Sequence, residues 1–186
     1  MKRILLGVTG SIAAYKSAEL VSQLTQRGHS VTAVMTTDAV EFIAPLTLQT
    51  LSRNPVVTGL YDEKESWRPS HIALADEADL LLIAPATAHL IARLALGLAG
   101  DALTAIALAT RAPCLIAPAM NGNMWLHPAT QAHVATLQSW QIEFVGPDPE
   151  GMLACGYRGP GRLASVEEIL ERAEAVLRQT PGPRRL

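Results

Sequence analysis

Short apolar runs alternate along this chain with stretches in which apolar residues recur at helical spacing. The runs at 2–8, 30–35, 79–84 and 114–117 have the length and the Leu, Ile and Val content of buried parallel strands. Between them, apolar residues recur at intervals of three and four, which predicts helices that bury one face. A strand, helix, strand order of this length implies parallel strands with right-handed crossovers. We therefore predict a three-layer doubly wound α/β domain.

The remaining elements follow from turn and capping signals. Gly28 suits the position just after the first helix, and Ser165 with Glu168 forms a capping box for the last one. We expect further helices at 37–53 (interrupted at Pro45), 71–78, 87–98, 101–110, 122–139 and 165–179, and a fifth strand at 141–145. Residues 61–69 and the glycine-rich 150–162 are expected to be irregular. Residues 1–179 then form one domain, followed by a flexible tail at 180–186.

Composition narrows the class of protein. Of the 186 residues, 49% are apolar and only 4% aromatic, so aliphatic side chains must build the core. A net charge of −2 offers no basic field to a phosphate backbone, which argues against nucleic acid as a partner. No apolar stretch reaches the roughly 20 residues of a membrane span or resembles a signal peptide. We expect a cytoplasmic protein with no membrane partner.

Hydroxyl groups follow three of the predicted strands. Gly10-Ser11 ends the first strand, Thr36 the second, and Thr87 comes after the third. Helix N-termini at such turns present free N–H groups to anions, although each hydroxyl alone is explained by helix capping. The Gly-x-Gly-x-x-Gly pattern is absent, and no acidic residue closes the second strand. A mononucleotide therefore fits better than a dinucleotide.

Three further residues carry polar or reactive groups. Asn121 lies just past the strand at 114–117, where it either caps the next helix or meets a ligand, and spacing alone favours the cap. His71 is isolated in sequence, and a lone histidine is more often a bystander than a catalyst. Cys155 lies in the glycine-rich segment and is either an acid on a mobile lid or a chance surface thiol. Cys114 begins a buried strand and is expected to be inert.

The other histidines, His29, His127 and His133, have no metal-ligand spacing, and two cysteines make neither a disulfide framework nor a zinc site. We therefore predict no metal centre.

Five motifs, taken together, resemble those of the homo-oligomeric flavin-containing cysteine decarboxylases. They occur in the family's order and span nearly the whole chain: Gly-Ser-Ile-Ala-Ala-Tyr-Lys at 10–16, His-Ile at 71–72, Pro-Ala-Thr-Ala at 85–88, Pro-Ala-Met-Asn at 118–121 with Met124-Trp125, and Leu-Ala-Cys-Gly at 153–156. The nearest branch of the family decarboxylates 4′-phosphopantothenoylcysteine to 4′-phosphopantetheine in coenzyme A biosynthesis. The resemblance implies a Rossmann-like or flavodoxin-like fold.

The resemblance also implies bound FMN at the interface of a homo-oligomer, a trimer or a dodecamer. The implied FMN-binding residues are Gly10, Ser11, Ile12, Thr36, Thr87, Ala88, His89, Leu90 and Ala119. His71 would be the active-site histidine, Asn121 would hold the substrate's carboxylate and amide, and Cys155 would donate a proton. The backbone of Met152, Leu153 and Ala154 would touch the substrate.

The implied reaction explains these residue types. The substrate thiol is oxidised to a thioaldehyde by FMN, CO₂ then leaves as an enethiolate forms, and the electron pair and a proton are returned. A thiol such as Cys155 can hold a proton near neutral pH and still give it up.

One departure from the family pattern and several alternatives stay open. His89 stands where relatives usually have Asn or Asp, which leaves flavin contacts there in question. The family's decarboxylase is often fused to a synthetase domain, and this chain is either stand-alone or part of such a fusion. Related functions on this fold are a peptidyl-cysteine decarboxylase, an FMN prenyltransferase and a non-catalytic phosphatase-regulating protein. Asn121 and Cys155 argue against the prenyltransferase, and the presence of all three candidate residues argues against the non-catalytic protein.

Overall fold

The computed structural model describes residues 1–60, 70–154, 156 and 158–179. Within that part of the chain, five parallel strands form one sheet in the order β2-β1-β3-β4-β5. The strands are β1 (Arg3–Val8), β2 (Ser30–Met35), β3 (Leu80–Ala86), β4 (Cys114–Pro118) and β5 (Glu143–Phe144). The predicted loop at 61–69, the tail at 180–186 and Cys155 lie outside the described residues.

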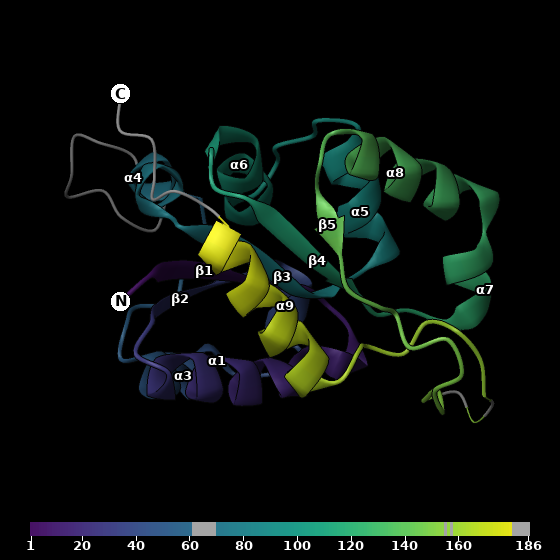
Figure 1. Ribbon diagram of the computed structural model, residues 1–186, viewed down its shortest axis with the longest axis horizontal. Helices are drawn as coiled ribbons and strands as arrows, with labels where there is room; N and C mark the ends of the chain where they lie inside the picture. Colours follow the sequence, from purple (N-terminus) through teal and green to yellow (C-terminus); the bar gives the residue numbers. More distant parts are fainter. Residues whose placement is uncertain (61–69, 155, 157, 180–186) are drawn as a thin grey trace.

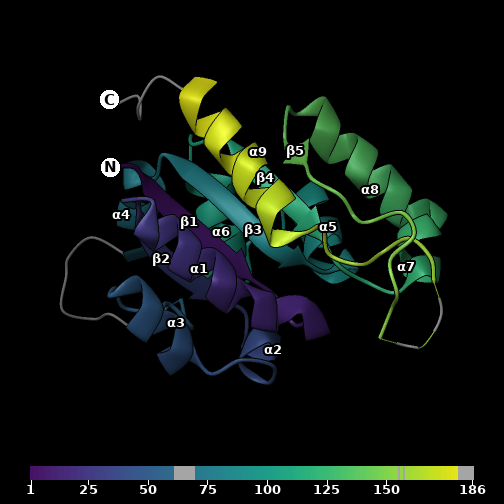
Figure 2. The ribbon, with the colours of Figure 1, turned by 60° about the horizontal axis from the view of Figure 1, so that its bottom comes forward.

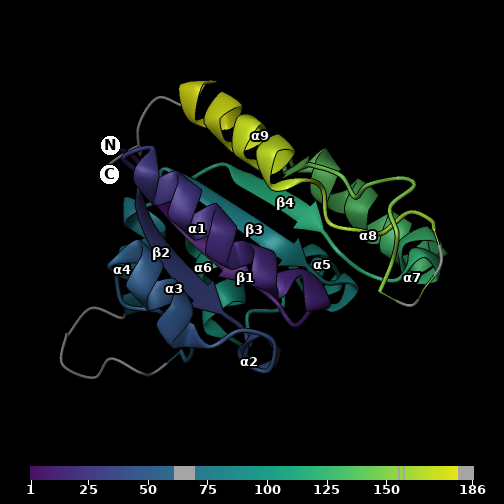
Figure 3. The same cartoon turned by 90° about the horizontal axis from the view of Figure 1, so that it is seen from below.

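Helices cover both faces of the sheet, as the doubly wound prediction requires (Figure 1). Figure 3 shows α1, α3 and α9 together on one side of the strands. Their bounds are α1 (Lys16–Gln26), α3 (Pro45–Ser52) and α9 (Val166–Gln179), and the opposite face carries α4 (Ser70–Glu77), α5 (Ala88–Ala95), α6 (Ala102–Ala109) and α8 (Pro128–Ser139). Three short elements lie at loops near the strand ends: η1 (Ile12–Tyr15), α2 (Thr37–Val40) and α7 (Gly122–Leu126). No helix of the described residues is long and apolar enough to cross a membrane.

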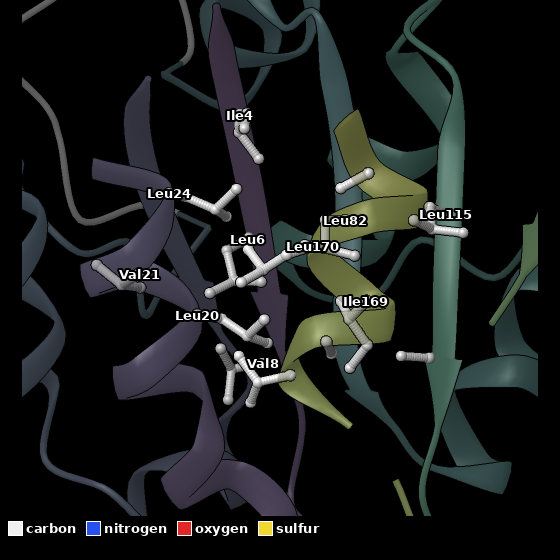
Figure 4. Packing of buried hydrophobic residues seen from close by; sticks show 14 of the residues in the cluster. Ile4, Leu6, Val8, Leu20, Val21, Leu24, Leu82, Leu115, Ile169 and Leu170 are labelled. Carbon is white, nitrogen blue, oxygen red and sulfur yellow. The ribbon is translucent and has the colours of Figure 1, made fainter. Parts of the chain in front are cut away.

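Two aliphatic clusters fix the three layers. Side chains alternate across the sheet, so that Leu6 of β1 packs toward α1 and α9, while Leu5 packs toward the other face. Figure 4 shows Leu20 of α1 and Leu170 of α9 among the side chains packed over this face of β1 and β3. These side chains are almost fully buried. Because the strands are apolar on both faces, the sheet is central, and polar chemistry is left to its ends.

The strand order places a switch point between β1 and β3. The chain moves outward from β1 to β2 on one side and from β3 to β5 on the other. At such a point the adjoining loops diverge and leave a crevice beyond the carboxyl ends of the strands, where doubly wound proteins bind ligands. The turn after β1 and the turn after β3 adjoin this point, and Figure 2 shows β1 and β3 side by side in the sheet.

Several element boundaries differ from the sequence prediction. The expected helix at 122–139 is two helices, because His127 precedes Pro128 and adopts an extended backbone. The expected strand at 141–145 is reduced to two residues. Pro118 was expected to stop β4, yet it is the last strand residue and pairs with Ala86. Beside it, the Ala119 N–H donates to the Ala86 carbonyl oxygen at 3.0 Å, so the pairing of β4 with β3 does not need the N–H that proline lacks.

Candidate functional site

A pocket of about 680 Å³ opens at the carboxyl ends of β1, β3 and β4. This volume is in the usual range for small-molecule and cofactor sites. We call it the main pocket; its lining residues are Gly10, Ser11, Ile12, Ala13, Tyr15, Lys16, Thr87, Ala119, Met120, Asn121, Met124, Met152, Leu153, Ala154, Gly161, Arg162 and Leu163. It therefore lies where the strand order predicts a ligand.

Thr9 ties the two strands at the switch point together. Its buried hydroxyl donates to the Pro85 carbonyl oxygen at 2.7 Å and accepts from the Thr87 N–H at 3.1 Å. Near the start of α1, the Ser17 hydroxyl donates to the Ala84 carbonyl oxygen at 2.9 Å. These bonds satisfy buried backbone groups and hold the turn after β3 against the turn after β1.

The three hydroxyls predicted at strand ends all cap helices. Ser11, Thr36 and Thr87 each accept from a backbone N–H of the following helical turn at 3.3 Å. Helix capping thus accounts for each of these three hydroxyls, which is the explanation that the sequence offered for each one alone. The same geometry brings the starts of η1, α2 and α5 to one edge of the sheet, where their unpaired N–H groups favour an anion.

A side cavity of about 80 Å³ adjoins the main pocket and shares Gly10 and Thr87 with it. The side cavity is lined by Thr9, Gly10, Thr36, Thr37, Asp38, Thr87, His89, Leu90, Arg93 and Asp101. Gly10 permits the close approach of α2, because a Cβ there would stand 2.4 Å from the Cβ of Asp38. Of the predicted cofactor residues, Gly10, Ser11, Ile12, Thr87 and Ala119 line the main pocket, and Thr36, His89 and Leu90 line the side cavity. Ala88, the first residue of α5, lines neither.

Arg93 and Asp101 at the side cavity were missed by the sequence reasoning. The Asp101 carboxylate caps α6 by accepting from the Thr104 N–H at 2.8 Å, and it pairs with the Arg93 guanidinium. Burial alone would raise the pKa of Asp101, but the hydrogen bonds from Thr104 and the Arg93 charge outweigh it and lower the pKa below its ordinary value. The capping-box spacing of Asp101 and Thr104 was the available signal.

Asn121 lines the main pocket and also caps α7. Its Oδ1 accepts from the Asn123 N–H at 2.8 Å, so the cap favoured by spacing is present. Because the side chain is half-buried at the pocket wall, it is placed both to cap and to meet a ligand.

The predicted substrate-contacting residues form another wall of the main pocket. Met152, Leu153 and Ala154 all line it. Cys155 is outside the described residues, but Ala154 directly before it faces the pocket. The segment is irregular in its described part, as predicted, and isolated bridges from Asp148 to Arg162 and from Met152 to Arg158 hold it.

His71 lies away from the main pocket of its own chain. It lies in the first turn of α4 and is half-buried, and its buried Nδ1 has no hydrogen-bond partner among the residues that the structure describes. Figures 1 and 2 place α4 and α7 toward opposite ends of the molecule. The structure thus brings Asn121 together with the segment before Cys155, but it does not bring His71 to them within one chain.

Burial raises the pKa of the Cys114 thiol to about 12, so the thiol stays protonated near neutral pH. Among the residues that the structure describes, no three His, Cys, Asp or Glu side chains are grouped so that they could hold a metal ion.

Tyr15, Lys16, Met124 and Arg162 line the main pocket although we did not predict them as site residues. Tyr15, Lys16 and Met124 belong to the quoted motifs, and membership of a motif was the only sequence signal that they line the site. Arg162 had none, because its place depends on how the irregular segment folds back.

Comparisons with known proteins identify the family of this chain. Residues 1–178 match the model of the Flavoprotein family. The chain is 47% identical over 180 residues to the coenzyme A biosynthesis bifunctional protein CoaBC of Vibrio vulnificus, covering 97% of this chain but 45% of that protein. It is 46% identical over 178 residues to a probable phosphopantothenoylcysteine decarboxylase of Streptococcus mutans, covering 95% of this chain and 99% of that one. The chain thus spans less than half the length of the bifunctional relative.

Two solved structures share the fold over nearly their whole length. A cysteine-to-serine mutant of PPC decarboxylase, complexed with pantothenoylaminoethenethiol, superposes with a TM-score of 0.83 at 32% identity, covering 94% of this chain and 97% of that one. The FMN-dependent cysteine decarboxylase SpaF superposes with a TM-score of 0.84 at 33% identity, covering 96% and 97%.

Proposed function

Because the chain belongs to the Flavoprotein family, we propose that it is an FMN-dependent decarboxylase that converts 4′-phosphopantothenoyl-L-cysteine to 4′-phosphopantetheine. The observation that carries the proposal is the main pocket, where the turn after β1, Ala119 to Asn121 and Met152 to Ala154 meet at the switch point. The relative from Streptococcus mutans, which matches over almost its whole length, supports the choice of substrate.

The residues present fit FMN. Ser11, Thr36 and Thr87 place three helix starts at one edge, where N–H groups suit a phosphate. The absence of a side chain at Gly10 lets α2 lie close against the turn after β1. Beside this polar end, Ile12, Ala119 and other mostly apolar side chains line a volume large enough for a flat aromatic ring. When bound, FMN supplies a reversible two-electron oxidation of the substrate's thiol.

Asn121 would orient the substrate. Its position at the start of α7 is fixed by its own capping bond, so the amide is held rather than mobile. We expect it to hold the carboxylate that leaves as CO₂ and the adjoining amide of the substrate, while the backbone of Met152 to Ala154 covers the other side. Holding the bond to be broken in one geometry removes the entropy cost of reaching it.

Cys155 would supply the last proton. After CO₂ loss, the saturated thiol forms only when the electron pair is returned as a hydride equivalent together with one proton, and the Cys155 Sγ–H would donate that proton. Ala154, the residue directly before it, lines the main pocket, which supports the role. A thiol with an ordinary pKa is protonated at neutral pH and can be reloaded from water between turnovers.

A second copy of the chain would complete the site with His71. Within one chain His71 is away from the main pocket, and its Nδ1 has no hydrogen-bond partner in the described part of the chain. The rim of the pocket exposes Ile12 (60%), Tyr15 (61%) and Met152 (53%), apolar groups that a neighbouring copy would bury. We propose a homo-oligomer, trimeric or dodecameric, in the cytoplasm.

The substrate is tested by comparing two kinds of cysteine compound. Purified protein loaded with FMN is given either 4′-phosphopantothenoylcysteine or a peptide ending in cysteine, and CO₂ release is measured. We expect release from the phosphorylated compound alone. Release from the peptide alone would make the protein a peptidyl-cysteine decarboxylase. No release from either, with FMN bound, would favour the FMN prenyltransferase or the non-catalytic alternative.

A further inference from the structure

Among the described residues, the main pocket is lined by two cationic side chains, Lys16 and Arg162, and by no Asp or Glu. Neither cation has a carboxylate of the described residues within 4.0 Å. Lys16 is half-buried and Arg162 is exposed, and two cations without a carboxylate partner at one pocket favour an anionic ligand there.

Lys16 is half-buried at the wall of the main pocket. It is the first residue of α1 and continues directly from η1, because its backbone N–H donates to the Ala13 carbonyl oxygen. Glu19 in the first turn makes no ion pair with it, and instead its carboxylate accepts from Gln23. A bound anion would supply the partner that the described residues do not give the Lys16 ammonium.

Arg162 approaches the same pocket from the irregular segment. Its backbone is anchored, because its carbonyl oxygen accepts from the Asp148 N–H at 2.8 Å. Its aliphatic stem lies over Gly151, where a Cβ would stand 2.5 Å from Arg162 Cδ. The stem is thus fixed while the guanidinium stays exposed, which suits a group that meets ligand at the pocket mouth.

Resting on the proposed function, we infer that Lys16 and Arg162 bind the substrate's phosphate and so select phosphorylated substrates over cysteine-ended peptides. The flavin phosphate is expected at the side of Ser11, Thr36 and Thr87, and neither cation lines the side cavity there. The substrate carboxylate is assigned to Asn121. The phosphate at the other end of the substrate is the anion that still lacks a partner, and guanidinium and ammonium groups are the usual ligands of phosphate.

The test measures selectivity as well as activity. For wild type, Lys16→Gln and Arg162→Gln, kcat/KM is determined for 4′-phosphopantothenoylcysteine and for its dephosphorylated form. We expect wild type to prefer the phosphorylated compound, and each variant to reduce the ratio of the two values about tenfold or more, as loss of a charge-assisted hydrogen bond does. Arg111→Gln, an exposed arginine outside the pocket, is the matched control and should keep the ratio.

Binding is measured separately from turnover. Calorimetric titration of the flavin-loaded protein with 4′-phosphopantetheine and with pantetheine should show that each variant weakens only the phosphorylated compound. Salt should weaken that compound in wild type, since screening acts on charge pairs. Equal losses on both compounds, or loss of bound FMN, would overturn the inference and make these residues flavin ligands or structural. Absence of CO₂ from both substrates in wild type would instead reject the proposed function.

Discussion

Gly161 and Met120 lie in direct backbone contact and close the main pocket. The Met120 N–H donates to the Gly161 carbonyl oxygen at 2.9 Å. A Cβ at Gly161 would stand 2.3 Å from the Met120 carbonyl oxygen, and the residue has φ of +121°. The end of β4 and the irregular segment are therefore joined at a point that only glycine fits. This junction places Asn121 on one wall of the pocket and Ala154 on another.

Gly161→Ala should loosen this junction. We expect a loss of about 3 kcal/mol in the free energy of unfolding, roughly 1 from the backbone conformation and the rest from the clash, together with weaker FMN binding. Denaturant unfolding and a flavin titration measure the two effects.

Gly156→Ala is the control for backbone conformation alone. Gly156 has φ of +89° and nothing within 4 Å of an added Cβ. It should cost only about 1 kcal/mol. If both variants lose the same stability, the contact with Met120 is not what holds the junction.

Asp101→Ala should weaken the fold in a pH-dependent way. The pKa of this carboxyl is lowered in the folded protein, so its contribution is present above its unfolded pKa and is lost as the pH falls through the folded value. At pH 7 we expect a loss of about 1 to 2 kcal/mol in the free energy of unfolding, from the cap of α6. The difference from wild type should shrink below pH ~4.

Asp101→Asn separates the cap from the charge. It keeps an acceptor oxygen at the N-cap but cannot titrate. At pH 7 it should therefore lose less unfolding free energy than Asp101→Ala, and its unfolding free energy should depend less on pH than that of wild type. Urea titrations at several pH values compare the three proteins. A constant gap between wild type and Asp101→Ala from pH 3 to pH 7 would show that the carboxylate charge contributes nothing.

Cys114 should resist alkylation in the folded protein. Because burial raises the pKa of its thiol to about 12, almost no thiolate exists at pH 8. In a Cys155→Ser background, iodoacetamide should label Cys114 only after unfolding, as mass spectrometry would show. Labelling of the native protein within minutes would mean that the thiol is accessible and ionised.

Mixed oligomers test whether His71 comes from a second copy. His71→Asn and Asn121→Asp should each be nearly inactive while retaining FMN. Dissociated and reassembled together, they should regain activity, because some pockets then combine an intact Asn121 with an intact partner histidine.

The control mixes Asn121→Asp with Cys155→Ser. Because both residues are proposed to act in the pocket of their own chain, every pocket of this mixture carries one substituted catalytic residue. It should regain nothing. Mixtures of the first pair that assemble together and still stay inactive would place His71 outside the catalytic site.

The fold was predictable because its signals are local and repeated. Each buried strand, such as β3, is a continuous aliphatic run, and Gly28, Ser165 and Glu168 mark helix ends with the bonds expected of them. The predicted element boundaries were wrong where a hydrogen bond to a neighbouring strand determines where the element ends. Pro118 stays in β4 because the bond beside it comes from Ala119, which a sequence pattern does not show.

The site was predictable only where it follows the strand ends. Ser11, Thr87 and Asn121 sit directly after strands, so the sheet brings them together. Arg162 reaches the pocket through the return of an irregular segment, and sequence alone does not fix that path. The same applies to His71, whose helix lies on one face of the sheet while the pocket lies at its edge.

The most direct test of the account is a stoichiometric balance of the reaction. Flavin-loaded protein is incubated with 4′-phosphopantothenoylcysteine without any added oxidant or reductant, and CO₂, 4′-phosphopantetheine and the flavin spectrum are followed in one sample. The account predicts one CO₂ for each 4′-phosphopantetheine over many turnovers, with the flavin oxidised at the end. Flavin-loaded protein that leaves the substrate intact, or that needs an external electron acceptor for every CO₂ released, would contradict it.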